Sequence, residues 1–247
     1  MINRPFAIRC VDTAPAGTLD VVIRFSANTT PSDEGLRLVQ RLMGHFIQVG
    51  ANGALSGSRI PPTDSTLVLS AERIGPDRCA WRFEQVRVAS DTRMVLENII
   101  HFVHLNVSPV AQLDFVMQPG GGMMAASHEP PKLFAPPPFQ CVIEPEAAEV
   151  VIDIDFDPPV ADKNAREQFV RFWDSWLYIA AAGGFEIEDF TSRGITIFPA
   201  SEPDSQPDQI SLFMDDVSVA ATAFDALVNG FHRLHFTVAP IRRLHVY

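Results

Sequence analysis

The sequence comprises 247 residues, of which 47% are hydrophobic and 20% are charged, and its formal net charge is −11. This length accommodates one large domain or two smaller ones, and this composition excludes a chain that is disordered throughout. The acidic balance argues against nucleic acid or an anionic membrane as the main partner, because both of these bind basic surfaces.

The first part of the chain begins with two apolar strands and an amphipathic helix. Residues 6–12 predict a short leading strand, and residues 19–25 (LDVVIRF) predict a central strand because they are mostly apolar and β-branched. Ser32 and Asp33 are candidate N-caps of the helix that follows, and the GANG stretch that begins at Gly50 predicts its end. The apolar residues of this helix recur at helical spacing: Leu36, Val39, Leu42, Met43, Phe46 and Ile47.

Two further strands, a second helix and a last strand complete this part of the chain. Residues 66–71 and 80–89 predict the two strands. The second helix begins near Ser90, and a strand at residues 113–116 follows Pro109. The apolar residues of this helix again follow helical spacing: Val95, Leu96, Ile99, Ile100 and Val103.

The remainder of the chain repeats this order at an offset of 131 residues, the separation of His101 from His232. The segment HFVHLNVSPVAQL at residues 101–113 corresponds to HRLHFTVAPIRRL at residues 232–244. Further identities at this offset are Cys10 with Cys141, Ile23 with Ile154, Val39 with Val170, and Gly53 with Gly184. The expected strands are residues 139–143, 150–156, 194–198, 210–220 and 244–247, and the expected helices cover residues 165–180 and 224–234. A fixed offset over this length indicates an internal duplication.

One strand in each part of the chain shows the same change of phase. Its apolar residues alternate at first and then shift by one position. An extra residue in the strand restores the inward face, so we expect a β-bulge at Glu84-Gln85 and another at Asp215-Asp216.

The order of elements in each part is β-α-β-β-α-β with an additional leading strand, which is the split βαβ or ferredoxin-like pattern. We therefore predict an α+β fold in which two ferredoxin-like repeats, residues 1–116 and 136–247, form a pseudo-dimer. Residues 117–135 are rich in glycine and proline and predict a linker. We expect the open sheet faces of the repeats to cover each other, which makes the seam between the repeats the candidate groove.

The duplicated HxxH segment contains the candidate metal ligands, which are His101, His104, His232 and His235. Two histidines at i, i+3 share one face of a helix, and imidazole nitrogens suit zinc, copper, iron or nickel. The segment lacks the glutamate of an HExxH motif. On a helical wheel, His101 lies opposite the apolar stripe, whereas His235 lies beside the stripe of its own helix. The alternative is structural, because histidines in a last helical turn can interact with free carbonyl groups and with the helix dipole.

A strip of carboxylates provides the candidate partner-binding residues Asp153, Asp155 and Asp157, and Asp215 and Asp216 form a second acidic pair. The three residues of the strip alternate with apolar residues, so they share one face of a strand. Paired carboxylates can perform acid–base chemistry or bind a hard cation. The first repeat has no carboxylates at the positions that correspond to the strip. A solvated face or a surface for a basic partner is therefore the simpler interpretation.

The sequence lacks the motifs of several common classes of enzyme and cofactor-binding protein. No GxSxG motif, P-loop or GxGxxG motif is present in the sequence, and we expect no cofactor. The cysteines Cys10, Cys79 and Cys141 are too few and too scattered for a disulfide framework or a CxxC zinc site. The sequence also has no apolar leader and no run of about 18 apolar residues. We therefore expect a cytoplasmic protein with reduced thiols and no membrane contact.

These features favour a non-catalytic, acidic protein-binding module, such as an immunity-protein-like inhibitor or an assembly adaptor. We expect a protein partner, with a basic surface as one option. A first alternative is a small-molecule or metal-dependent enzyme that has its site at the seam and uses the four histidines. A second alternative is a structural subunit of a larger assembly.

Overall fold

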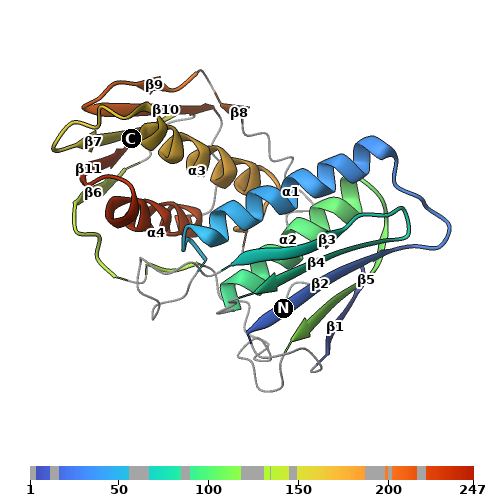
Figure 1. Ribbon diagram of the computed structural model, residues 1–247. Coiled ribbons are helices and arrows are strands. Elements are labelled where there is room, and N and C mark those ends of the chain that lie inside the picture. Colours follow the sequence, from blue (N-terminus) through green and yellow to red (C-terminus); the bar gives the residue numbers. More distant parts are fainter. Residues whose placement is uncertain are drawn as a thin grey trace.

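The computed structural model describes ten stretches of the chain (Figure 1): residues 4–11, 17–55, 67–84, 90–117, 131–133, 135–144, 149–186, 198–199, 202–215 and 221–247. We refer to residues 4–117 as the first half and to residues 131–247 as the second half. Across these stretches, no helix is long and apolar enough to cross a membrane.

The described part of the first half forms five strands and two helices. The strands are β1 (Ala7–Val11), β2 (Thr18–Phe25), β3 (Val68–Arg73), β4 (Arg78–Glu84) and β5 (Val110–Met117). The helices are α1 (Asp33–Ala51) and α2 (Ser90–Asn106). Each element starts within three residues of its predicted position.

The second half has the same order of elements. Its strands are β6 (Gln140–Ile143), β7 (Glu149–Phe156), β8 (Phe198–Pro199), β9 (Asp204–Ser205), β10 (Gln209–Asp215) and β11 (Ile241–Val246), and its helices are α3 (Lys163–Ala181) and α4 (Ala221–Thr237). The short strand β9 was not predicted. Most of the predicted strand at residues 194–198 lies outside the described residues.

The two sheets have equivalent strand orders. The order is β1-β5-β2-β4-β3 in the first sheet, here called sheet A, and β6-β11-β7-β10-β8 in the second, called sheet B. The strands β8 and β9 pair with different ends of β10, so together they occupy the edge position that β3 has in sheet A. The leading strands β1 and β6 run parallel to β5 and β11, and the other pairs are antiparallel. The chain is therefore a mixed α+β protein with a two-part arrangement.

Strand register shows which residues of the two halves correspond. Ile23 pairs with Leu113 in sheet A, and Ile154 pairs with Leu244 in sheet B, so the central strands correspond at the predicted offset of 131.

The leading strands correspond at a different offset. Ile8 pairs with Leu113, and Cys141 pairs with Leu244. Cys141 therefore corresponds to Ile8, and the predicted match of Cys10 with Cys141 is wrong. The reason is that the connection after the leading strand differs in length between the halves, which a single offset cannot represent.

Helices α1 and α3 correspond at an offset of 130, because both span 19 residues and begin at residues 33 and 163. Both are followed by a glycine of positive φ, Gly53 (φ 73°) and Gly183 (φ 68°), a conformation that glycine adopts without steric cost. The predicted match of Gly53 with Gly184 is therefore wrong by one residue. The connection at residues 26–32 is one residue longer than the connection at residues 157–162, which accounts for the shift.

The helix starts follow local capping chemistry. Ser32 caps α1 as predicted, since its Oγ accepts the backbone N–H of Gly35 at 3.0 Å. Asp162 caps α3 and accepts the backbone N–H of Asn164 at 2.9 Å.

The observed register shifts lie in other places than the predicted bulges. Gln85 and Asp216, which complete the two predicted bulge sites, lie outside the described residues. Among the described strand pairs, the first shift falls between Arg24 and Phe25, where β2 pairs with β5. The second lies between Ile241 and Arg243, where β11 pairs with β7. Both shifts are at the start of the last strand of a half, and a third lies within β3.

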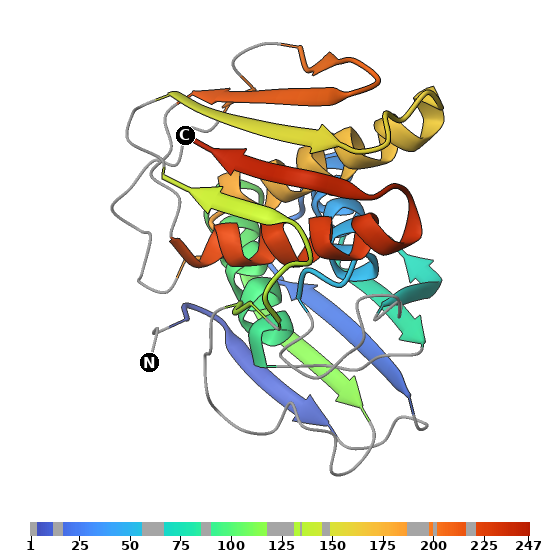
Figure 2. The same cartoon turned by 90° about the vertical axis from the view of Figure 1, so that its left-hand side faces the viewer.

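The sheets lie on the outside of the molecule, and the four helices lie between them (Figures 1 and 2). Helices α1 and α3 pack against each other and join the two halves. The expectation that the open sheet faces cover each other is therefore wrong. The physical reason lies in the helices, because α3 is buried on more than one side. Its buried aromatic residues are Phe169, Phe172, Trp173 and Trp176.

Candidate functional site

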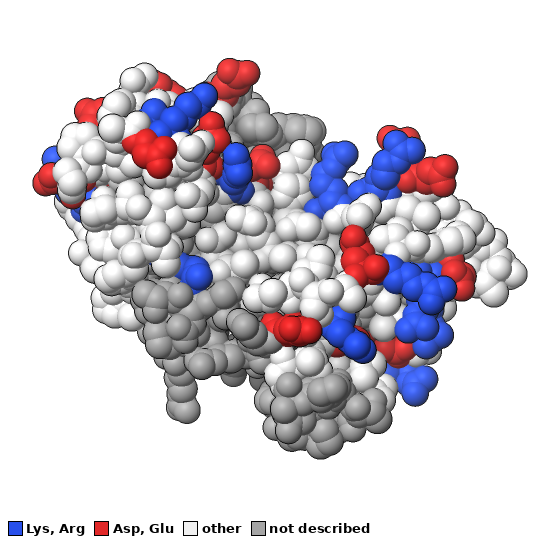
Figure 3. All heavy atoms as spheres, viewed as in Figure 1, with Lys and Arg blue, Asp and Glu red and all other residues white. Residues whose placement is uncertain are grey.

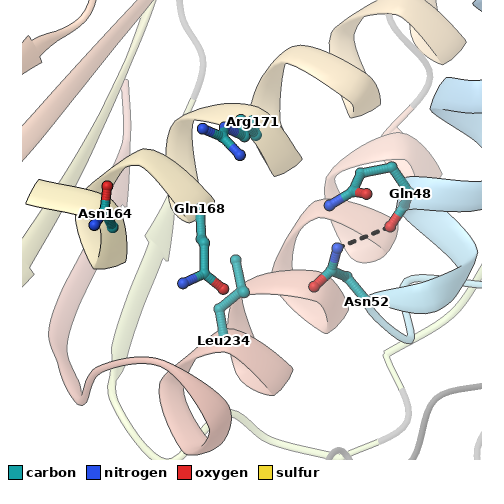
Figure 4. Close-up of a pocket in the computed structure, with 6 residues that line it drawn as sticks. All are labelled: Gln48, Asn52, Asn164, Gln168, Arg171 and Leu234. Carbon is teal, nitrogen blue, oxygen red and sulfur yellow. Dashed lines mark hydrogen bonds between the residues drawn. The ribbon is translucent and has the colours of Figure 1, made fainter.

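A groove of about 400 Å³ opens at the seam, where the C-terminal end of α1 meets the first half of α3 (Figure 4). Its lining residues come from three helices and the C-cap of α1: Gln48, Asn52, Asn164, Gln168, Arg171 and Leu234. The seam is thus the location of the groove, as predicted, although helices and not sheets form it.

The polar groups of the groove are held by local contacts. The side-chain amide of Asn52 donates to the carbonyl oxygen of Gln48 at 2.8 Å. Arg171 donates to Glu167 at 3.0 Å, and the ammonium group of Lys163 lies 3.7 Å from the same carboxylate. Leu234 is buried and contributes the apolar part of the lining.

The position of α3 that corresponds to Gln48 carries an aromatic residue. At the offset of 130 between α1 and α3, Tyr178 corresponds to Gln48. The ring of Tyr178 is stacked on His45, with 4.2 Å between ring centroids and an interplanar angle of 5°. The shorter side chain of Gln48 makes no such stack in the described contacts, and the groove opens beside it. The two corresponding positions therefore differ in side-chain size and chemistry.

His45 lies at the contact between α1 and α3 and interacts electrostatically with Asp174 of α3. Burial lowers the pKa of His45, and Arg41 lowers it further, whereas Asp174 opposes both effects. Burial raises the pKa of Asp174, and His45 partly opposes this shift. These directions favour a neutral imidazole at the contact between α1 and α3.

The four candidate metal ligands occupy equivalent structural positions. The Nδ1 atom of His104 accepts the backbone N–H of Val110 at 3.0 Å, and Nδ1 of His235 accepts the backbone N–H of Ile241 at 2.9 Å. Each of these histidines therefore joins the end of a helix to the start of the next strand. In both halves, the second histidine of the HxxH segment thus uses its Nδ1 atom to accept a backbone hydrogen bond.

The orientation expected for His101 is wrong. Its side chain is buried, with 2% exposure, and its Nδ1 lies 2.9 Å from the guanidinium group of Arg4. His101 also packs edge-on against Phe6, as His232 packs against Phe139. The helical wheel assumed that α2 has one buried face. Arg4 and Phe6 of the N-terminal segment cover a second face, and this face contains His101.

The described side chains do not assemble into a metal centre. Among residues that the structure describes, no group of three or more His, Cys, Asp or Glu side chains could hold a metal ion. Burial lowers the pKa of both His232 and His235, as expected for neutral histidines packed against phenylalanine rings.

The carboxylate strip lies on the outer face of sheet B, and its first two members have close partners. Asp153 accepts hydrogen bonds from Ser211 at 2.6 Å and from Tyr247 at 3.1 Å. Asp155 is buried, with 4% exposure, and accepts from Arg243 at 2.9 Å and from Arg242 at 3.3 Å. The charge of Asp155 is thus already compensated by arginines of β11.

The other members of the predicted acidic surface are apart from these two. Asp157 is exposed in the turn after β7. Asp215 is the last residue of β10, and Asp216 lies outside the described residues. The structure therefore brings Asp153 and Asp155 together on one strand, as predicted, and leaves Asp157 beyond its end.

The groove residues were not recognised in the sequence. Their only signal is the set of exposed amide side chains on α1 and α3, which resembles ordinary helix surface. The packing of the two helices, and not any local motif, brings these amides together.

Comparison with known proteins adds no functional assignment. No protein-family profile matches this chain, and no curated protein matches it. Among solved structures, the periplasmic protease PqqL of Escherichia coli aligns with 91% of this chain at 10% sequence identity. The chain spans 34% of that protease, and the TM-score is 0.17. A similarity of this size carries no argument about fold or function.

Proposed function

We propose that this chain is a non-catalytic protein-binding module built from two fused ferredoxin-like repeats, and that it binds a polypeptide segment in the groove between α1 and α3. The chemistry of the groove carries the proposal, because its lining consists of four side-chain amides, one guanidinium group and one leucine. None of these groups acts as a nucleophile or exchanges a proton at neutral pH. All of the polar ones form hydrogen bonds. The set therefore favours binding over catalysis.

The equivalence of the two sheets supports the two-repeat part of the proposal. Both halves have the same strand order, and their central strands correspond residue by residue. The buried residues of α1 and α3 correspond in the same way, as Phe46 does to Trp176 and Val49 to Ile179. One unit that was duplicated and fused is the simplest origin for this equivalence.

The lining residues favour an extended peptide as the ligand. A side-chain amide both donates and accepts hydrogen bonds, so it matches the N–H and C=O groups of a peptide backbone. Arg171 can bind a carboxylate of the ligand through two parallel hydrogen bonds, and Lys163 would then retain Glu167. The volume of the groove falls within the range of ordinary ligand sites.

The acidic strip gives weaker support to a basic partner. Asp155 is already paired with two arginines, and Asp153 is already hydrogen-bonded to Ser211 and Tyr247. A basic partner would have to displace these contacts, whereas a ligand in the groove meets exposed amide groups at Gln48 and Gln168.

The variant Gln48→Tyr tests the proposal. It places on α1 the side chain that α3 carries at the corresponding position, so it should fill the groove without changing the core. The matched control is Gln40→Tyr, because Gln40 lies on the same helix, outside the groove lining, and bonds Glu72 of β3. A phage-displayed library of random linear peptides is selected on the native protein, and the enriched peptides are then assayed on both variants.

We expect enriched peptides to carry an acidic residue, to bind Gln40→Tyr as they bind the native protein, and to lose most of their affinity for Gln48→Tyr. In ¹⁵N-labelled protein, the side-chain amide signals of Gln48, Asn52, Asn164 and Gln168 should shift on peptide addition. Equal binding to both variants would place the site elsewhere. Cleavage of a bound peptide would contradict a non-catalytic role.

A further inference from the structure

The outer face of sheet A carries five arginines. In β2 the residues Leu19, Val21 and Ile23 are buried against the helices, so the alternate residues of the strand point outward. Strand register extends this outer face across the sheet. Its arginines come from β1, β2, β3 and β4: Arg9, Arg24, Arg73, Arg78 and Arg82.

This face has the opposite charge to the chain as a whole. The outward positions of the five strands hold these five arginines and three carboxylates, Asp20, Glu84 and Asp114, which gives a net charge of +2. The chain has a net charge of −11. Figure 3 shows Lys and Arg side chains interspersed with Asp and Glu side chains over the part of the molecule that sheet A forms. The outward positions of sheet A therefore carry a small net positive charge on a chain that is acidic as a whole.

The arginines differ in how far they are already paired. Arg82 forms two hydrogen bonds of 2.7 Å with Asp20, and Asp114 lies within 3.3 Å of Arg24 and 4.0 Å of Arg9. Among the described residues, Arg73 and Arg78 have no ion pair, and the Nε atom of Arg78 is buried without a hydrogen-bond partner. These two guanidinium groups thus retain their capacity to bind an anion.

The fold does not require this charge. At the corresponding register positions of sheet B, Arg24 is replaced by Asp155, Arg78 by Gln209 and Arg82 by Phe213. The two sheets have the same strand order, so an arginine-rich face is not needed to form it. At these three positions the outer face of sheet A thus carries arginines where sheet B carries none.

We propose that the outer face of sheet A is a docking surface for an acidic segment of a partner protein. Arginine binds carboxylates in a planar, bidentate manner, and all five cations of this face are arginines. The carboxylates interspersed among them, and the net charge of the chain, oppose the dense phosphates of a nucleic acid. This surface is separate from the groove, and it does not depend on the function proposed for the groove.

The direct test uses a fluorescein-labelled oligoglutamate peptide as the probe and fluorescence anisotropy as the readout. The test variant combines Arg73→Gln with Arg78→Gln, the two arginines without ion pairs. The matched control combines Arg37→Gln with Arg41→Gln, which removes the same charge from exposed positions on α1. Circular dichroism establishes that both variants are folded. Titrations are repeated at about 50 mM and about 500 mM NaCl, because exposed charges are screened by salt.

We expect the native protein to bind oligoglutamate at low salt and to lose this binding at high salt. The test variant should bind about tenfold more weakly, and the control should bind within about twofold of the native protein. In the native protein, the Nε–H signal of Arg78 should shift on peptide addition. The proposal is overturned by equal losses in the two variants, by tighter binding of a single-stranded oligonucleotide, or by self-association that the test variant abolishes.

Discussion

His45 of α1 and Ser175 of α3 meet across the contact between the two halves, with 3.1 Å between Nδ1 and Oγ. At the offset of 130, the two residues occupy corresponding positions in their helices. A residue thus bonds its own counterpart, as happens where an approximate twofold axis crosses an interface. The ring of Tyr178 is stacked on His45 at the same contact, and the groove lined by Gln48 lies on the same pair of helices.

The contact at His45 should make stability depend on pH. Burial lowers the pKa of His45 below its ordinary value of 6.5, so the unfolded chain binds this proton more readily than the folded chain. The stability that neutral His45 contributes is fully present above pH 6.5 and is lost as the pH falls toward its folded pKa. The raised pKa of Asp174 gives the opposite slope, so Asp174 cannot produce this loss.

Urea unfolding of the native protein and of His45→Gln over a series of pH values measures this effect. We expect the free energy of unfolding of the native protein to fall more steeply below pH 6.5 than that of the variant. His232 and His235 also have lowered pKa values, but both proteins contain them. If the free energy of unfolding depends on pH in the same way in both proteins, protonation of His45 does not affect stability.

Gly230 of α4 should tolerate no side chain. A Cβ atom at this position would overlap the ring of Phe172 in α3, and relief of this overlap would force the two helices apart. We expect Gly230→Ala to lower the free energy of unfolding by about 3 kcal/mol. Gly44→Ala is the control, since a Cβ there meets nothing within 4 Å, and we expect it to raise stability by about 0.5–1 kcal/mol. Urea unfolding at neutral pH compares the two, and a stable Gly230→Ala protein would disprove this packing of α3 on α4.

Removal of the His104 imidazole should cost stability without any involvement of metal. The variant His104→Ala leaves the backbone N–H of Val110 without its acceptor, at a cost of about 1–3 kcal/mol, and His235→Ala should act in the same way at Ile241. Thermal unfolding with and without a chelator checks both claims. A chelator that destabilises the native protein, but neither variant, would favour the metal hypothesis instead.

Asn98 of α2 should stabilise the contact between the two halves. Its buried amide donates to the carbonyl oxygens of Gly184 and Glu186 in the second half, at 2.9 Å each. Asn98→Ala removes both donors and should lower the free energy of unfolding by about 1–3 kcal/mol. Asn98→Asp keeps the shape and the acceptor of Arg4 but cannot donate to the two carbonyl oxygens, so it should also be less stable than the native protein. If Asn98→Ala is as stable as the native protein, the two bonds do not contribute to stability.

The candidate site could be predicted only in part. The alternation of Asp153 and Asp155 with buried isoleucines placed both carboxylates on one outer face, because alternation is a local property of a strand. The sequence could not show that Arg243 lies beside Asp155, because strand pairing brings together residues 88 positions apart. A strip that looked like free acidic surface is thus partly neutralised.

The sequence by itself determined the four helices, the order of the elements, the strands other than the short β8 and β9, and the offset that links the central strands. Period-two and period-3.6 apolar patterns and helix caps such as Ser32 act within a few residues, so they can be read locally. Only the tertiary structure decided that the helices face inward, that His101 is buried, and that Gln48 lines a groove between α1 and α3. These outcomes depend on which buried surfaces of the two halves pack together. The contacts between α1 and α3 determine this packing, and they join residues about 130 positions apart, beyond the reach of a local sequence pattern.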